Sequence, residues 1–418
     1  MDKLRIEGGH PLSGQLQVSG SKNSALPAIA ACLLSEQPVV LHRIPRVRDI
    51  GTMLKLLEHN GATVEWLEGG ALRITAAEIR NPEAPYEIVK TMRASSLVLG
   101  PLAARTGRAK VSMPGGCSIG ARPINLHING LEHLGAVVHQ EHGDIEAVAE
   151  KGLRGNTVHF ERITVTGTED LMMAATLAEG TTVLENAARE PEVVDLANLL
   201  SKMGAQIEGA GTSRIRIEGV KKLRGAEHEI IADRIEAGTF VIAGVATGSE
   251  VVVSGCVPEH FASLLVKLRQ AGARVEEAGT SVEVRPAGRL RSVDMTTEEH
   301  PGFATDLQAQ FMALMTRATG ISFITENIFE NRFMHVPELA RMGANIRIEG
   351  KQAIVAGPST LTGAQVMCSD LRASASLVVA AMVAQGNSIL DRVYHIDRGY
   401  ESIEKKLAAA GANIERIG

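Results

Sequence analysis

Six copies of one segment recur along the chain, and this repetition constrains the fold more than any other feature. In each copy a helical pattern ends at Gly-Ala and continues as alternating residues, as in LLEHNGATVEW and LSKMGAQIEG. A glycine at this point is typical of a helix that ends in the left-handed region, and alternation is typical of a strand. The glycine recurs at nearly even spacing, as Gly61, Gly135, Gly204, Gly272, Gly343 and Gly411. The chain is therefore predicted to contain six repeats of a helix-and-strand unit.

Each copy also contains an Ala-rich helical segment, a turn of small residues and an apolar strand, as in GVATGSEVVVSG and VAQGNSILDRV. These helical segments are apolar on nearly all sides, which predicts that they are buried with sheets around them. Repeats of about 70 residues are longer than those of the familiar solenoids. We therefore expect three repeats to close into one domain and three into a second, with a boundary near Arg224 to Asp233.

Composition excludes several classes of partner. The net charge of −5 and an aromatic content of 3% argue against general binding to nucleic acids or anionic membranes. The four cysteines are far apart, with no CxxC pair and no histidine at zinc-ligand spacing, which favours a reducing compartment. The N-terminus lacks an apolar segment, and the longest apolar runs are too short to span a bilayer. We expect a soluble, cytoplasmic protein with no nucleic-acid or membrane partner.

Cations stand at the predicted beginnings of Ala-rich helices. Lys22 lies at the turn Gly-Ser-Lys-Asn into the first, while Arg93 in MRASSLVL and Arg372 in LRASASLVV occupy equivalent places in two repeats. The N-terminus of a helix binds anions through its free N–H groups and its dipole. An anion site is one interpretation, and ordinary surface or structural cations are the other.

Two further residues are candidates for chemistry. Cys117 lies between glycines in PGGCSIGARP, and Arg122 five residues later favours its thiolate, although an inert, half-buried cysteine remains an alternative. Asp306 in TDLQAQ opens a predicted helix, where it could cap the first turn or act as a general base. No P-loop, GxGxxG, HExxH or serine elbow is present, so we expect no nucleotide-hydrolysing, metal or nicotinamide chemistry.

Several long motifs carry a family resemblance. The segments VSGSKNSALP, TMRAS, PGGCSIGARP, TDLQAQF, IFENRFMHVPELARMGA and DLRASASLVVA, followed by YHIDRGYE, closely resemble the UDP-N-acetylglucosamine enolpyruvyltransferases of the EPSP synthase family, from Met1 to Gly418. The resemblance implies an α/β fold, a two-domain inside-out barrel with three repeats per domain, helices inside and sheets outside. It implies one domain of residues 22–231, a second of residues 1–21 plus 232–418, and an active site in the cleft between them.

The resemblance also implies an activity. Such an enzyme transfers the enolpyruvyl group of phosphoenolpyruvate, a co-substrate, to the 3'-hydroxyl of UDP-N-acetylglucosamine and releases phosphate by addition and elimination. This is the first committed step of peptidoglycan synthesis, and it uses no cofactor or metal. Three alternatives are an EPSP synthase, which lacks the GGC loop, a non-catalytic regulatory paralogue that binds the nucleotide sugar, and a structural repeat scaffold.

Residue roles follow from the resemblance by position. Cys117 is implied as the acid that protonates the methylene carbon, and as the site that the inhibitor fosfomycin alkylates. Asp306 is implied as the general base, and Lys22, Arg122 and Arg398 as further catalytic residues. The implied substrate-binding residues are Asn23, Arg93, Arg122, Pro123, Ile124, Asn125, Leu126, His127, Arg162, Ile163, Thr164, Val165, Asp306, Ile328, Arg332 and Arg372. Asn125 stands where many members have Asp, and Arg162 and Thr164 where Lys and Ser are common, which concerns the uridine contacts.

Overall fold

Contacts within the chain define two compact units in the computed structural model, which describes residues 2–113 and 124–418, the side chain of Arg93 excepted. One, the 20–231 unit, contains the described residues from Gly20 to Ile231. The other, the 232–418 unit, combines Ala232–Gly418 with the N-terminal segment Met1–Ser19. The polypeptide therefore passes from one unit to the other between Ser19 and Gly20 and again between Ile231 and Ala232.

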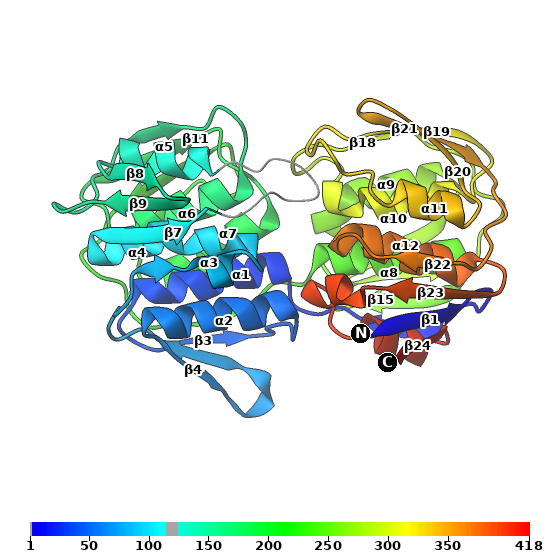
Figure 1. Cartoon of the computed structure of the whole chain (residues 1–418), viewed down its shortest axis with the longest axis horizontal. Helices are drawn as coiled ribbons and strands as arrows, with labels where there is room; N and C mark the ends of the chain where they lie inside the picture. Colours follow the sequence, from blue (N-terminus) through cyan, green and yellow to red (C-terminus); the bar gives the residue numbers. More distant parts are fainter. Residues whose placement is uncertain (1, 114–123) are drawn as a thin grey trace. The chain divides into compact units, whose positions relative to one another are not determined.

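Six four-stranded sheets of one topology form the framework of the described residues (Figure 1). In the order in which the strands of each sheet are named below, the first two are parallel to each other, and the other neighbouring strands are antiparallel. The sheets of the 20–231 unit are β14 (Glu227–Glu229), β3 (Val39–His42), β5 (Leu72–Thr75) and β4 (Thr63–Trp66); β6 (Glu83–Ala84), β7 (Arg108–Ser112), β9 (Asp144–Val148) and β8 (Val137–Glu141); and β10 (Thr157–His159), β11 (Thr181–Glu185), β13 (Arg214–Glu218) and β12 (Gln206–Glu208).

The 232–418 unit repeats this arrangement. Its sheets are β2 (Ser13–Gln17), β15 (Glu250–Ser254), β17 (Ser281–Arg285) and β16 (Arg274–Ala278); β18 (Met295–Thr296), β19 (Gly320–Thr325), β21 (Gln352–Gly357) and β20 (Asn345–Glu349); and β22 (Gln365–Met367), β23 (Asn387–Asp391), β1 (Lys3–Glu7) and β24 (Asn413–Ile417). The predicted α/β class with six repeats is confirmed.

Helices fill the interior of each unit (Figure 1). Those of the 20–231 unit are α1 (Lys22–Ala31), α2 (Arg48–Asn60), α3 (Tyr86–Val89), α4 (Leu99–Thr106), α5 (Asn125–His133), α6 (Val165–Ala175) and α7 (Pro191–Lys202). Those of the 232–418 unit are α8 (Arg234–Thr247), α9 (Ala262–Gln270), α10 (Gln308–Met315), α11 (Val336–Arg341), α12 (Leu371–Val383) and α13 (Ile403–Ala409). The Ala-rich helices α8, α10 and α12 contact one another, and every residue of α8 from Ile235 to Ala246 is buried, as the sequence predicted.

All six repeat glycines have the backbone conformation that the sequence predicted. Their φ values lie between 91° and 106°, in the left-handed region where a side chain would be strained. The strands β4, β8, β12, β16, β20 and β24 follow them directly. The αL ending lets the helix before each glycine reverse into a strand that lies at the edge of a sheet.

One expected equivalence between repeats was wrong in detail. The helix at Arg372 is α-helical from Leu371 because the carboxylate of Asp370 accepts bonds from two amides of its first turn. In the second repeat residues 93–98 form a 3₁₀ segment, and α4 begins only at Leu99. The residue that corresponds to Asp370 is Thr91, whose hydroxyl donates backward to the carbonyl of Ile88 and does not cap.

The first strands of the chain complete sheets of the sixth and fourth repeats. β1 lies between β23 and β24, with Lys3 opposite Ile417, and β2 pairs with β15. The two ends of the chain are therefore neighbours on one sheet (Figure 1). In the sixth repeat β1 occupies the third position of the sheet. In each of the other repeats this position belongs to a strand that forms a hairpin with the edge strand.

A buried ion pair fixes the end of this N-terminal segment. The amide of Ser19 donates to Glu236 Oε2 at 2.6 Å, and Lys406 Nζ donates to Glu236 Oε1 at 2.7 Å and to Ser19 Oγ at 2.6 Å. Glu236 is 2% exposed, and burial raises the pKa of its carboxyl although Lys406 opposes the shift. The hydroxyl of Ser19 also donates to Glu401 Oε2 at 3.2 Å, so the last residue before the chain leaves the 232–418 unit is held by three charged side chains.

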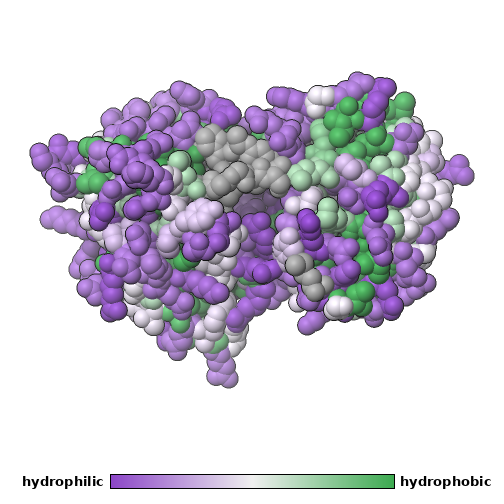
Figure 2. All heavy atoms as spheres, in the orientation of Figure 1, coloured by the Kyte–Doolittle hydropathy of each residue, from purple (hydrophilic) through white to green (hydrophobic). Residues whose placement is uncertain are grey.

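The face shown in Figure 2 is mainly hydrophilic, and its larger apolar areas lie on the 232–418 unit. Ile321 and Phe323 of β19 are exposed there, while Ser322 and Ile324 between and beside them are buried. None of the described helices combines the length and the apolarity needed to cross a bilayer.

Candidate functional site

Asp306 lies between two arginines of the 232–418 unit. It belongs to a 3₁₀ turn, Thr305–Leu307, that leads into α10. Its Oδ1 accepts from Arg332 Nη2 at 2.7 Å, and its Oδ2 accepts from Arg372 Nε at 3.0 Å and Nη2 at 2.7 Å. The side chain makes no capping bond to the helix, so the capping interpretation is not supported. Three residues that the sequence singled out, far apart along the chain, therefore form one cluster.

The electrostatics of this cluster set the protonation state of the carboxyl group. Burial alone would raise the pKa of Asp306, but the guanidinium groups of Arg372 and Arg332 outweigh burial and hold that pKa well below its usual range. Both arginine side chains are almost fully buried, at 5% and 6% exposed. Asp306 is consequently ionised and a weak base while both arginines bind it. An anion that competes for the arginines would raise its basicity.

A buried polar network supports Arg372. The Tyr400 ring centroid lies 5.6 Å from its guanidinium carbon, and the Tyr400 hydroxyl bonds Thr239 Oγ1 at 2.9 Å. Gln310 Nε2 donates to Thr239, to Tyr400 and, at 3.0 Å, to the backbone carbonyl of Asp306. Sequence reasoning missed this network, because Thr239, Gln310 and Tyr400 lie in three different repeats.

Two more predicted residues lie in the 232–418 unit. Arg398 is half-buried and ends a 3₁₀ segment, Val393–Arg398, that contacts α12. Ile328 follows β19 in the loop that leads to Arg332, and its amide donates to Glu326 Oε1 at 2.8 Å.

Lys22 begins α1 of the 20–231 unit, as the sequence predicted. The hydroxyl of Ser21 caps this helix by accepting from Ser24 N. Lys22 Nζ lies 3.2 Å from Asp49 Oδ2, and its side chain is only 12% exposed. The interpretation of an ordinary surface lysine is therefore wrong. Asp49, in the first turn of α2, was missed because an acidic residue there looks like a simple partner of the helix dipole.

The other predicted binding residues of this unit lie at two helix beginnings. Ile124 precedes α5, and Asn125 is its exposed first residue. His127 is buried, with Nδ1 3.3 Å from Asp170 Oδ2 and Nε2 3.2 Å from Thr166 Oγ1. Arg162, Ile163 and Thr164 directly precede α6, and Val165 is its first residue. The hydroxyl of Thr164 caps the helix by accepting from Gly167 N at 3.2 Å.

Glu169 on α6 is a buried acid beside other acids, and it predicts a pH-dependent stability. Burial, followed by Glu192, Glu190 and Asp170, raises its pKa well above the usual range. As pH rises above about 4.5 the unfolded chain loses this proton while the folded chain keeps it, so stability falls. We expect Glu169→Gln to raise the free energy of unfolding at pH 8 by at least about 1 kcal/mol and to change it little at pH 4.

Urea unfolding at the two pH values measures this effect. Glu132→Gln, on the exposed surface of α5, is the matched control and should give the same small change at both pH values. An equal effect of Glu169→Gln at pH 4 and pH 8 would contradict the assignment.

Some predicted site residues lie outside the part of the chain that the structure describes. These are Cys117, Arg122, Pro123 and the side chain of Arg93. The roles of these four residues therefore depend on the resemblance of their motifs alone.

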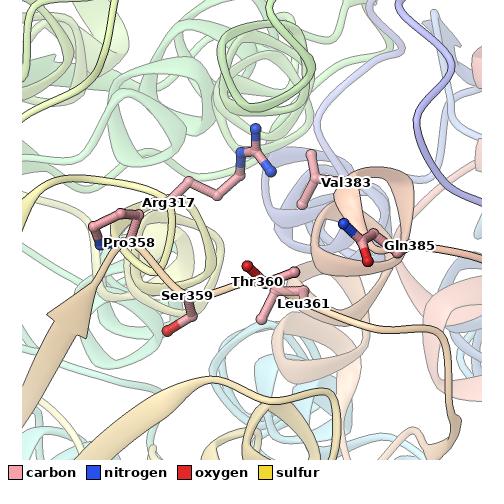
Figure 3. A pocket seen from close by; sticks show the side chains of 7 residues that line it. All are labelled: Arg317, Pro358, Ser359, Thr360, Leu361, Val383 and Gln385. Atoms are coloured by element: carbon pink, nitrogen blue, oxygen red, sulfur yellow. The ribbon is translucent and has the colours of Figure 1, made fainter.

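A depression of about 260 Å³ lies at the other end of the helices that carry the Asp306 cluster. Figure 3 shows Arg317, which follows α10, together with Val383 at the end of α12 and residues 358–361. Arg372 and Val383 are separated by the length of α12, roughly 17 Å at 1.5 Å per residue. Among the described residues that the sequence predicted for a site, none lines this depression.

Comparison with known proteins gives consistent results. The family model described as EPSP synthase (3-phosphoshikimate 1-carboxyvinyltransferase) matches residues 6–407. A protein of Solibacter usitatus named UDP-N-acetylglucosamine 1-carboxyvinyltransferase is 69% identical over 100% of both chains. One of the same name from Koribacter versatilis is 62% identical over 100% of this chain and 97% of its own. Among solved structures, the enolpyruvyl transferase NikO from Streptomyces tendae has a TM-score of 0.89 and 25% identity, covering 99% of this chain and 98% of its own.

Proposed function

Since the chain belongs to the EPSP synthase (3-phosphoshikimate 1-carboxyvinyltransferase) family, we propose that it transfers the carboxyvinyl group of phosphoenolpyruvate to the 3'-hydroxyl of UDP-N-acetylglucosamine. The observation that carries this proposal is that relatives matching its whole length are named for that reaction. The reaction would be the first committed step of peptidoglycan synthesis, in the cytoplasm. Phosphoenolpyruvate is a co-substrate, and we propose no cofactor.

The proposed reaction proceeds by addition and elimination. The acceptor oxygen bonds to C2 of phosphoenolpyruvate, its proton goes to a base, and another proton is added to C3. The resulting tetrahedral intermediate then loses phosphate from C2 and a proton from C3, which restores the double bond. Atoms and charges balance without an oxidant or reductant.

Asp306 is proposed as the base for the acceptor hydroxyl. In the described structure Arg332 and Arg372 bind both of its oxygens, which suppresses its basicity. The phosphate and carboxylate groups of the substrates are anions that guanidinium groups bind through paired hydrogen bonds. When these arginines bind substrate, Asp306 becomes the stronger base, so substrate arrival and base activation are coupled.

The remaining cations are proposed to hold the same anionic groups. Lys22, Arg93, Arg122 and Arg398 join Arg332 and Arg372 in stabilising a tetrahedral intermediate that carries a phosphate and a carboxylate on one carbon. The nucleotide sugar is assigned to the residues at the starts of α1, α5 and α6 and to Ile328. These assignments follow from the resemblance of the motifs.

Cys117 is proposed to deliver the proton to C3 and to react with fosfomycin. The two roles use different forms of this side chain: the protonated thiol would deliver the proton to C3, and the thiolate, which Arg122 favours, would attack fosfomycin. After treatment with fosfomycin, we expect peptide mass spectrometry to find one adduct at Cys117 and none in Cys117→Ala.

Phosphate release tests the function directly. We expect release from phosphoenolpyruvate with UDP-N-acetylglucosamine, none with shikimate 3-phosphate, and loss of the activity after fosfomycin. Release with shikimate 3-phosphate would instead identify an EPSP synthase. Silence with both acceptors, while the nucleotide sugar still binds in calorimetry, would identify the regulatory alternative.

A further inference from the structure

Glu326 is a buried carboxylate outside the residues assigned above, and four donors converge on it. It directly follows β19 and is 2% exposed. Its Oε1 accepts from Thr297 Oγ1 at 2.9 Å, from Ile328 N at 2.8 Å and from Phe329 N at 3.1 Å. Its Oε2 accepts from Thr305 Oγ1 at 2.9 Å.

These bonds connect Glu326 to both sides of the Asp306–Arg332 ion pair. Thr305 directly precedes Asp306, so the bond to its hydroxyl fixes the turn that aims the carboxylate. The amides of Ile328 and Phe329 begin the loop that ends at Arg332. Thr305 Oγ1 also accepts from Arg332 Nη1 at 3.2 Å, so one hydroxyl connects the two sides.

We propose that Glu326 is a positioning residue which, through Thr305 and the loop amides, holds Asp306 and Arg332 in register for the transfer reaction. This inference rests on the proposed function. A carboxylate suits the role because it only accepts hydrogen bonds, while all four groups around it donate. An amide at this position would turn a donor toward one of them.

The chain offers a matched control on the same carboxylate. Thr297 is fully buried, and its hydroxyl donates to Glu326 Oε1 at the same 2.9 Å as Thr305 does to Oε2. Thr297 Oγ1 also accepts from Asn327 N at 2.9 Å, and neither of these bonds involves Asp306 or Arg332. Thr297→Val therefore removes two bonds of the hydroxyl, to Glu326 Oε1 and from Asn327 N, and leaves the bonds of Thr305 to Glu326 and Arg332 in place.

The test compares kcat, KM and thermal stability of Thr305→Val, Thr305→Ser and Thr297→Val in the full-length protein. We expect Thr305→Val to lower kcat at least 10-fold with KM changed less than 3-fold, because small misplacement of reacting groups is costly. Thr305→Ser should restore most of kcat. Thr297→Val should keep at least half of kcat even if its melting temperature falls by as much as that of Thr305→Val.

Proportional losses of kcat and stability in Thr305→Val and Thr297→Val would overturn the proposal, as would failure of Thr305→Ser to restore activity. A second measurement needs no turnover. Hydrogen exchange of the peptide that spans residues 326–333 should accelerate in Glu326→Gln and Thr305→Val, and unchanged exchange in both would also overturn it. If wild type releases no phosphate while exchange accelerates as expected, the proposed function fails and the positioning by Glu326 stands.

Discussion

Asp306→Asn is expected to lower kcat by about 10²- to 10⁴-fold, the range that a positioned general base contributes. The asparagine has nearly the same shape and keeps one oxygen for the arginines, but it does not take a proton from the acceptor. Because Arg332 and Arg372 already occupy the carboxylate in the described structure, the loss should appear in kcat more than in binding of the nucleotide sugar. Phosphate release under substrate saturation and calorimetric binding give the two quantities separately.

The control for Asp306→Asn is Glu404→Gln. Glu404 is a largely buried carboxylate of α13 that pairs with Arg416 at 3.1 Å and makes none of the bonds of the Asp306 cluster described above. It should keep nearly full kcat. Comparable losses in the two variants would mean that activity follows general stability and not the base.

Stability of Asp306→Asn should also depend on pH. The pKa of Asp306 is depressed in the folded chain, so its ionised form stabilises the fold above the unfolded pKa of about 4 and this contribution is lost as pH falls below it. The variant should therefore be less stable than wild type at pH 7, by about 1–3 kcal/mol, with the gap narrowing in acid.

Lys406→Met is expected to cause the largest loss of stability, about 2–4 kcal/mol at pH 8. Breaking a buried ion pair leaves an uncompensated charge, here Glu236, and the 22% exposure of Lys406 reduces the effect somewhat. The loss should be smaller at pH 5, because Glu236 already has a raised pKa and can take up a proton there. Urea unfolding at both pH values measures the change.

Two companion variants make this result specific. Lys405→Met removes a neighbouring exposed lysine and should change stability by less than about 0.5 kcal/mol. The double variant Lys406→Met with Glu236→Gln should recover much of the loss, since no buried charge then remains at this pair. A Lys406→Met protein as stable as Lys405→Met at pH 8 would show that Glu236 is already neutral in the fold.

Local patterns in the sequence predicted most of the fold. Each repeat has its own glycine, its own apolar helix and its own alternating strand, so these signals need only neighbouring residues. The prediction failed where one side chain changed a helix start, as at Asp370, whose capping has no counterpart at Thr91. Capping depends on a single rotamer, which periodicity does not report.

The site was predictable mainly through family resemblance. Spacing alone did not decide whether Lys22 binds an anion or is an ordinary surface cation, or whether Asp306 is a general base or a helix cap. Their partners Asp49, Arg332 and Arg372 are distant in the sequence, and only the folding of the chain brings them close. Glu326 was missed for a different reason, because an acid at the end of an apolar strand looks like the start of a surface turn.

The pairing of β1 with β23 and β24 affects how the protein is made. During translation the segment that ends at Ser19 is synthesised before the 20–231 unit, whereas β23 and β24, which pair with β1, are synthesised after it. The 20–231 unit has all its own strands once Ile231 has emerged from the ribosome, so it can fold before the partner strands of β1 have been synthesised. Lys3 lies opposite Ile417, so a short linker could join residues 1 and 418 in a circular permutant that opens between Ile231 and Ala232. In that permutant each unit would be one continuous stretch of chain, and β1 would be synthesised directly after β24.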